Sequence, residues 1–203
     1  SFTASILSSN GENMPEVCGI GLVNKDDEHA PQIIKAANCE LYTYSEESKE
    51  ADFVASDIRY VSQPDFVGTE FHISGKYDME VRLGIPGLFN VVNALAAVSV
   101  CSFLGLDQAR ISHALENIRV NGRMEIVYTS ERCTVLVDYA HNAVSMESLL
   151  STLRDYKPKR LVCVFGCGGN RSKDRRYSMG EIGGKMADLS IITADNSRYE
   201  KVE

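Results

Sequence analysis

The chain has 203 residues, enough for one large or two small globular domains. Hydrophobic residues make up 44% and charged residues 24%, which excludes a disordered, collagenous or low-complexity chain. No apolar stretch reaches the roughly 18 residues of a membrane span, and the net charge of −7 argues against general nucleic-acid binding. We therefore expect an ordinary soluble globular protein without membrane or nucleic-acid partners. Six cysteines without metal-ligand spacing predict reduced core thiols and a cytoplasmic location.

Charge divides the chain into two halves. Residues 1–120 carry 8 basic and 17 acidic side chains, a balance of −9, whereas residues 121–203 carry 13 basic and 11 acidic, a balance of +2. A helical pattern stops near Val120-Asn121-Gly122, and strand-like segments begin after it. The sequence therefore predicts one domain over residues 1–120 and another over 121–203. Because Ser1 stands in place of an initiator Met, we expect a piece of a longer protein.

The first half combines strands with helices. Strand, helix, strand over residues 17–23, 29–37 and 41–44 predicts a βαβ unit, and residues 53–58 predict a further strand. Alternating residues 66–73 and 77–83 around Gly75-Lys76 predict a hairpin. Helices are expected over residues 90–104 and 108–117, the second capped by Asp107.

The second half alternates strands and helices, which is typical of a parallel sheet. Asp138, residues 166–176 and residues 195–198 each follow a strand, so this topology would bring them to one edge of the sheet. The expected elements are strands over 124–129, 133–137, 160–165 and 189–193, with helices over 143–155 and 178–187.

A glycine-rich segment follows the strand that ends at Phe165. Its glycines allow backbone amides to approach an anion, and Arg171 and its basic neighbours offer donors for phosphate or carboxylate. The spacing of Gly166, Gly168 and Gly169 does not match a dinucleotide-binding fingerprint. A solvated turn is the alternative interpretation of this segment.

Five other side chains are candidates for nucleotide contacts. Asp138 could accept hydrogen bonds from a ribose, with His141 near a phosphate. Alternatively, Asp138 could cap the next helix and His141 could be a polar loop residue. Arg123, at the domain boundary, could reach a phosphate or form an interdomain salt bridge.

Asn90 and Asn93 lie one turn apart on an apolar helix. Their amides could read the edge of a base. Helix capping could account for Asn90 but explains Asn93 poorly.

Five segments together resemble the Mur ligase family in order and spacing. They are Gly87–Ala97, Gly122–Glu125, Val137–His141, Phe165–Gly169 and Asp195–Arg198. The resemblance implies an α/β fold, in which residues 1–120 end the central ATP-binding domain and residues 121–203 begin the Rossmann-like C-terminal domain.

The resemblance also implies ATP- and Mg2+-dependent amide-bond formation through an acyl phosphate, with a UDP-muramyl peptide and an amino acid as substrates. Asn90 and Asn93 would hold adenine, and Asp138 would meet the ribose. Arg123 would reach the phosphates with His141 beside it, so we expect these two to be catalytic. A monomer is expected.

The identity of the amino acid depends on two loops. By the resemblance, Arg171, Asp195, Asn196 and Arg198 would bind the amino acid substrate. Guanidinium groups match the distal carboxylate of meso-diaminopimelate, whereas lysine has no carboxylate there and its ammonium would be repelled. We therefore expect diaminopimelate.

The chain departs from the family pattern at several points. Ser197 replaces a proline, and Asn142-Ala143 replaces Thr-Pro, which removes rigidity from both loops. The phosphate-binding GxxxxGK[ST] loop and the family's carbamylated lysine have no counterpart, so we expect these 203 residues alone to be inactive. Alternatives are a folylpolyglutamate- or cyanophycin-type ligase, or a non-catalytic paralogue that binds nucleotide or muramyl peptide.

Overall fold

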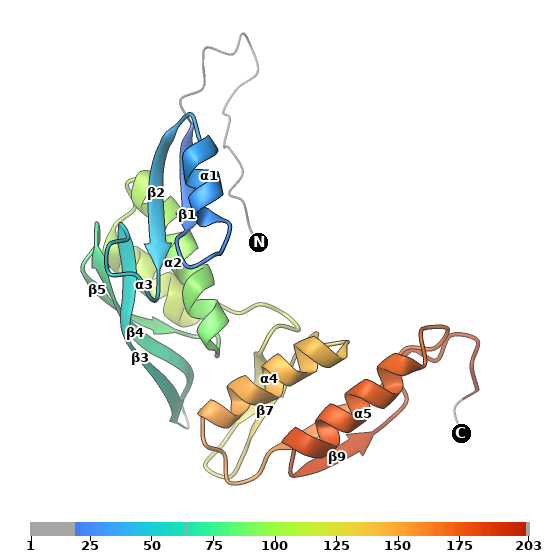
Figure 1. Cartoon of the computed structure of the whole chain (residues 1–203). Coiled ribbons are helices and arrows are strands. Elements are labelled where there is room, and N and C mark those ends of the chain that lie inside the picture. Colours follow the sequence, from blue (N-terminus) through green and yellow to red (C-terminus); the bar gives the residue numbers. More distant parts are fainter. Residues whose placement is uncertain (1–18, 64, 202–203) are drawn as a thin grey trace. The chain divides into compact units, whose positions relative to one another are not determined.

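The computed structural model describes residues 19–63 and 65–201 (Figure 1). The chain divides into two compact units, Ser1–Arg119 and Val120–Glu203. The first two residues of the strand predicted over 17–23, including Cys18, lie outside the described residues. Each unit contains its own cluster of buried apolar side chains.

A five-stranded sheet, in the order β1-β2-β3-β4-β5, forms the first unit. β1 (Ile20–Asn24) and β2 (Glu40–Ser45) pair in parallel, and α1 (Ala30–Ala36) connects them. This confirms the predicted βαβ unit. β3 (Phe53–Gln63) pairs in parallel with β2 and extends five residues beyond its predicted end at Ile58.

The predicted hairpin is also confirmed. β4 (Phe66–Gly75) and β5 (Met79–Leu83) pair antiparallel, with Thr69 opposite Leu83 and Ile73 opposite Met79. Gly75 adopts a φ of 107°, a conformation that glycine tolerates because it has no Cβ.

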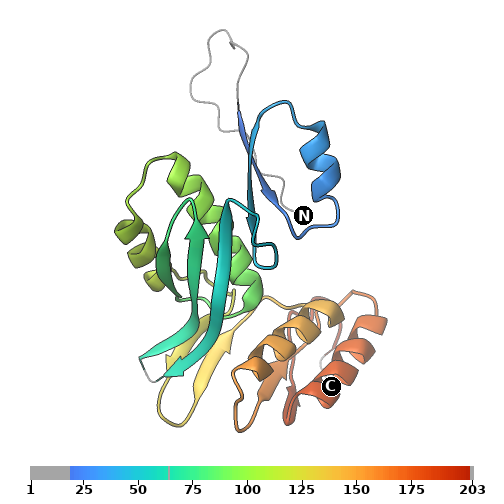
Figure 2. The same cartoon turned by 60° about the vertical axis from the view of Figure 1, so that its left-hand side comes forward.

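Two helices follow the sheet, α2 (Leu88–Phe103) and α3 (Gln108–Asn117). α2 packs along β1 to β4 (Figure 2), and its fully buried side chains meet those of the sheet. The Asp107 side chain accepts hydrogen bonds from the Ala109 and Arg110 amides, so the predicted cap is confirmed. The buried cluster includes Phe53, Phe71, Ile73, Leu83, Val91, Leu95 and Val98.

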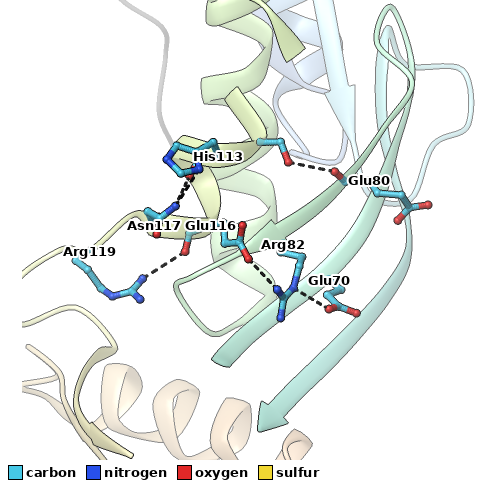
Figure 3. A network of polar contacts seen from close by, with 8 residues as sticks. Glu70, Glu80, Arg82, His113, Glu116, Asn117 and Arg119 are labelled. Atoms are coloured by element: carbon cyan, nitrogen blue, oxygen red, sulfur yellow. Dashed lines mark hydrogen bonds and ion pairs between the residues drawn. The ribbon is translucent and has the colours of Figure 1, made fainter. Parts of the chain in front are cut away.

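A charged network joins α3 to the sheet (Figure 3). The Arg82 guanidinium donates to Glu70 (3.1 Å) and Glu116 (2.7 Å). The Gly84 amide donates to the Leu115 carbonyl (3.0 Å), and a Cβ on Gly84 would lie 2.3 Å from the Glu116 carbonyl oxygen. α3 thus fixes the segment that leads into α2.

The second unit contains two small sheets and two helices. β6 (Glu125–Thr129) and β7 (Thr134–Val137) form an antiparallel hairpin, whereas β8 (Val162–Phe165) and β9 (Leu189–Ile192) pair in parallel. α4 (Ala143–Asp155) and α5 (Asp174–Met186) lie side by side (Figures 1 and 2). Their apolar faces pack with β8 in a cluster that includes Met146, Leu150, Leu161, Phe165 and Met179.

Three predictions for this unit need correction. β7 does not join β8 and β9, because a tight turn closed by the Ser130 amide and the Cys133 carbonyl (2.9 Å) pairs it with β6. α5 begins at Asp174 rather than near residue 178, since Arg175 and Arg176 continue the helix and no proline interrupts it. Cys133 is exposed rather than a core thiol, while Cys39, Cys101, Cys163 and Cys167 are half-buried and free.

None of the helices among the described residues combines the length and apolarity that crossing a bilayer requires.

Candidate functional site

The two asparagines of the first unit share one face of α2. Asn90 Nδ2 donates to the Pro86 carbonyl (2.7 Å), and Asn93 Nδ2 donates to Asn90 Oδ1 (3.3 Å). Asn90 is half-buried and Asn93 is exposed. The turn at Gly84 therefore orients Asn90 through Pro86, and Asn90 in turn orients Asn93 toward solvent.

A cluster at the start of the second unit brings together the predicted arginine, aspartate and histidine. The Arg123 guanidinium lies 4.6 Å from the centre of the Tyr139 ring, a cation–π contact. The Tyr139 and His141 rings are 5.1 Å apart, and His141 Nδ1 lies 3.2 Å from the Tyr139 carbonyl oxygen. Arg123, Tyr139 and His141 are all exposed, so they present one polar and aromatic surface.

Asp138 joins the two segments of this cluster. Its Oδ2 accepts from the Met124 amide (2.9 Å), and its Oδ1 accepts from the Ala140 amide (2.8 Å). Met124 is buried and has a positive φ of 46°, so this carboxylate holds the backbone beside Arg123 in an uncommon conformation. Each carboxylate oxygen has two lone pairs, which leaves acceptor capacity for a hydroxyl group.

The alternative role of Asp138 as a helix cap is wrong. Asn142 is the N-cap of α4, where its side chain accepts from the Ser145 amide (2.9 Å) in a capping box. Asp138 lies four residues earlier and binds other amides. Asn142 is also the first residue of the Asn142-Ala143 pair that replaces Thr-Pro of the family pattern, so this cap restrains a loop that the sequence predicts to be less rigid.

The glycine-rich loop and the loop after β9 lie against each other, as the parallel pairing of β8 and β9 predicts. The Gly169 amide donates to the Asn196 carbonyl (2.8 Å). A Cβ on Gly166 would lie 2.5 Å from the Thr193 carbonyl oxygen, and one on Gly169 would lie 2.0 Å from that of Ser197. Only glycine permits these two backbone approaches.

A pocket of about 260 Å3 lies where these loops meet. Asp195 lines it, together with Arg176 and Glu200, whereas Arg171, Asn196 and Arg198 lie outside its lining. Arg171 and Arg198 are exposed, and neither guanidinium makes an ion pair or hydrogen bond with the described part of the chain. Both are free to bind an anion.

Charge and burial change the pKa of two groups at this junction. The Arg176 guanidinium, an ion-pair partner, and the Asn170 amide lower the pKa of Glu200. Burial raises the pKa of the Cys167 thiol, while Arg176 and Arg175 oppose this shift. Glu200 is therefore ionised at neutral pH and Cys167 is a thiol.

The motifs did not assign a role to Tyr139, Asn170 or Glu200. Tyr139 lies inside the Val137–His141 motif. An aromatic ring directly after the end of a strand is a possible partner for a guanidinium, and this is the signal in the sequence for its contact with Arg123. Asn170 and Glu200 meet across 30 residues, and no spacing signal in the sequence indicates that contact.

The candidate residues thus form separate groups. Asn90 and Asn93 belong to the first unit. The Arg123, Asp138 and His141 cluster belongs to the second unit, as do the two loops with Arg171, Asp195, Asn196 and Arg198. That all of these residues act on one triphosphate and its substrates stays a prediction.

Comparison with known proteins gives two family matches. The Mur ligase middle domain matches residues 11–101, and the glutamate ligase domain of Mur ligases matches residues 122–203. A curated relative from Alkaliphilus oremlandii, UDP-N-acetylmuramoyl-L-alanyl-D-glutamate--2,6-diaminopimelate ligase, is 40% identical over 185 residues, which cover 89% of this chain and 37% of the relative.

Solved structures agree with this result. A ligase of the same name is 31% identical with a TM-score of 0.67, covering 90% of this chain and 38% of that one. A folylpolyglutamate synthase from Mycobacterium tuberculosis, solved with ADP and AMPPCP, has a TM-score of 0.66 at 18% identity over 91% of this chain and 41% of that one, which shows a shared fold. The chain belongs to the Mur ligase family, with sequence of its middle and C-terminal domains.

Proposed function

We propose that this chain is part of an ATP-dependent ligase that adds meso-diaminopimelate to UDP-N-acetylmuramoyl-L-Ala-D-Glu in the cytoplasm, during synthesis of the peptidoglycan precursor. The chain spans 37% of the length of the Alkaliphilus oremlandii relative, so the proposal concerns the full-length protein. One observation carries it. Two loops at the carboxyl ends of β8 and β9 are joined by backbone contacts and present two arginines that have no ion-pair partner among the described residues.

The loops suit an amino acid that carries two carboxylates and two amines. Arg171 and Arg198 would bind the distal carboxylate, because a guanidinium forms paired, charge-assisted hydrogen bonds with a carboxylate. The Asp195 carboxylate and the Asn196 side-chain oxygen would accept hydrogen bonds from the distal ammonium. Lysine would bring a second positive charge to the same loops without a carboxylate to pair with the arginines.

The remaining candidates suit a nucleotide. Asn90 and Asn93 would hold the adenine through their amides, and Asp138 would accept from ribose hydroxyls with its remaining lone pairs. Arg123, held over Tyr139, would bind phosphate oxygens with His141 beside it. Bound ATP supplies the phosphoryl group that activates the substrate carboxylate.

The proposed reaction has two steps. An oxygen of the D-Glu side-chain carboxylate attacks the γ-phosphorus and ADP leaves, which gives an acyl phosphate. The diaminopimelate amine then attacks the acyl carbon, phosphate leaves and the amine loses a proton. Cationic groups such as Arg123 would stabilise the negative charge that develops on the phosphoryl oxygens.

Magnesium is part of the proposal for the full-length protein, and its ligands are not assigned to the described residues. Residues 19–63 and 65–201 contain no group of three or more His, Cys, Asp or Glu side chains placed to hold a metal ion.

Isotope exchange tests the reaction in the full-length protein. With 18O in the D-Glu carboxylate, one label should appear in phosphate for each amide bond formed. No label in phosphate while product forms would rule out the acyl phosphate. No product with any muramyl peptide would instead support a non-catalytic paralogue.

Arginine variants test the amino acid substrate. Arg198→Ala and Arg171→Ala should each raise the KM for meso-diaminopimelate by about tenfold to a hundredfold, the usual loss for a charged hydrogen bond. Arg110→Ala is a matched control, because Arg110 is exposed on α3 in the first unit. Unchanged KM values in both loop variants would refute the assignment of diaminopimelate.

A further inference from the structure

Arg171 and Arg198 share a structural problem. Both lie on exposed loops outside any helix or strand, and arginine has high side-chain entropy. Two such groups bind one substrate well only if the backbones that carry them keep a constant spacing. The contact between Gly169 and Asn196 fixes one end of the junction, two residues before each arginine.

A second set of contacts encloses the arginines from the other side. The Asn170 amide donates to Glu200 Oε1 (2.8 Å), and the Tyr199 amide donates to Asn170 Oδ1 (3.3 Å). Asn170 immediately precedes Arg171, and Tyr199 immediately follows Arg198. These reciprocal hydrogen bonds therefore tie together the backbones next to both guanidinium groups.

Glu200 anchors this contact to a rigid element. Its carboxylate also pairs with the Arg176 guanidinium, and Arg176 lies in the first turn of α5. The Glu200 amide donates to the Ser197 carbonyl (2.9 Å), which closes a turn around Arg198. One carboxylate thus joins the glycine-rich loop, the loop after β9 and a helix.

The backbone conformations show that the contact constrains both loops. Asn170 and Arg198 have positive φ values of 54° and 50°. Asparagine tolerates this region, but arginine rarely adopts it and keeps it only where the surroundings hold the backbone. The turn at Ser197 and the contacts of Tyr199 and Glu200 supply that restraint.

We infer that Glu200, paired with Arg176, is a positioning residue that sets the spacing of Arg171 and Arg198 for a dicarboxylic amino acid. The inference rests on the proposed function for the role of the arginines. Glu200 itself need not touch the substrate. Its carboxylate would act on affinity for the amino acid and leave the nucleotide site unaffected.

Variants of Glu200 in the full-length protein test this role. Glu200→Ala removes the acceptor for both Asn170 and Arg176, and should raise the KM for meso-diaminopimelate about tenfold or more. Glu200→Gln keeps an oxygen for the Asn170 amide but loses the ion pair, so its KM should lie between those of the wild type and the alanine variant. The kcat and the KM for ATP should change less than twofold in both.

Hydrogen exchange gives a readout that does not depend on activity. The peptide containing Asn170 and Arg171 should exchange about tenfold faster in Glu200→Ala, because the Asn170 amide loses its acceptor. Glu181→Gln is the control, since it removes a carboxylate that pairs with Lys185 (2.5 Å) on α5, away from the loops. It should leave the KM and the loop exchange unchanged.

The outcomes separate this inference from the proposed function. If Arg171→Ala and Arg198→Ala raise the KM but Glu200→Ala does not, the positioning role is wrong and the substrate assignment stands. If kcat falls and the KM for ATP rises by as large a factor as the KM for the amino acid, Glu200 is a general stabilising residue and the inference is overturned. If neither arginine variant changes the KM, the substrate assignment is wrong and the positioning role of Glu200 is overturned with it.

Discussion

Gly169→Ala should separate the two loops of the second unit. A Cβ at this position would lie 2.0 Å from the Ser197 carbonyl oxygen and 2.7 Å from its carbonyl carbon. These are backbone atoms, so no side-chain rotation can relieve the clash. One loop must move by about 1 Å before the contact reaches the shortest distances that packed atoms tolerate.

Two contributions set the size of the effect. Overpacking of this kind costs about 1 to 3 kcal/mol, and the hydrogen bond from Gly169 to Asn196 contributes about 1 kcal/mol more when it breaks. We therefore expect a loss of about 2 to 4 kcal/mol in the free energy of unfolding of the second unit. The KM for diaminopimelate should rise as well, since Arg171 and Arg198 lie two residues from the displaced contact.

Gly168→Ala is the matched control. Its Cβ would lie 3.8 Å from the Asn196 carbonyl oxygen, an ordinary van der Waals contact, and the new methyl group would restrict the unfolded chain. This variant should be as stable as the wild type or up to about 1 kcal/mol more stable. Urea unfolding followed by circular dichroism measures both variants, and equal unfolding free energies would refute the close-approach argument.

Three further predictions concern the second unit. Asn142→Ala should lower its free energy of unfolding by about 1 kcal/mol in urea titrations, through loss of the capping box of α4. Asp138→Ala should raise the KM for ATP and speed amide exchange at Met124, whereas exchange unchanged from wild type would show that the carboxylate does not hold the backbone. The Arg154 side chain and the Leu161 amide lower the pKa of Asp188 in the folded state, so its contribution to stability exists above the ordinary aspartate pKa and is lost as pH falls through the lowered value. Asp188→Asn should therefore flatten the fall of the urea midpoint below about pH 4, and an unaltered acid profile would contradict this.

Much of the fold follows from local patterns in the sequence. The βαβ unit, the hairpin around Gly75 and the cap at Asp107 all depend on residues close together in the chain, and all three are confirmed. The placement of β7 does not follow from such patterns. Alternation of strands and helices predicts a parallel sheet, but the turn at residues 130–133 offers β7 a nearer partner in β6.

The candidate site shows the same division. The proximity of the two loops could be predicted, because parallel strands end at one edge of a sheet and β8 pairs with β9. The contact of Asn170 with Glu200 could not, since it depends on how far each loop extends and on the backbone conformation at Arg198. Motifs thus indicated which loops meet but not which side chains hold them together.

Two loops lack a proline of the family pattern, at Ser197 and at Ala143. A proline fixes its own φ and also restricts the unfolded chain, so its loss at Ser197 and Ala143 suggests looser loops. The structure shows restraint of a different kind at both places. Asn142 forms a capping box at the start of α4, and asparagine is at least as good an N-cap as threonine.

At Ser197, contacts between loops take the place of a rigid residue. Gly169 packs against the Ser197 backbone, the Glu200 amide donates to the Ser197 carbonyl, and the Tyr199 amide donates to Asn170 Oδ1. Such restraint differs from that of proline because it exists only when both loops are folded together. The loop after β9 should therefore lose its order together with the glycine-rich loop, and a single variant such as Gly169→Ala should increase hydrogen exchange in both.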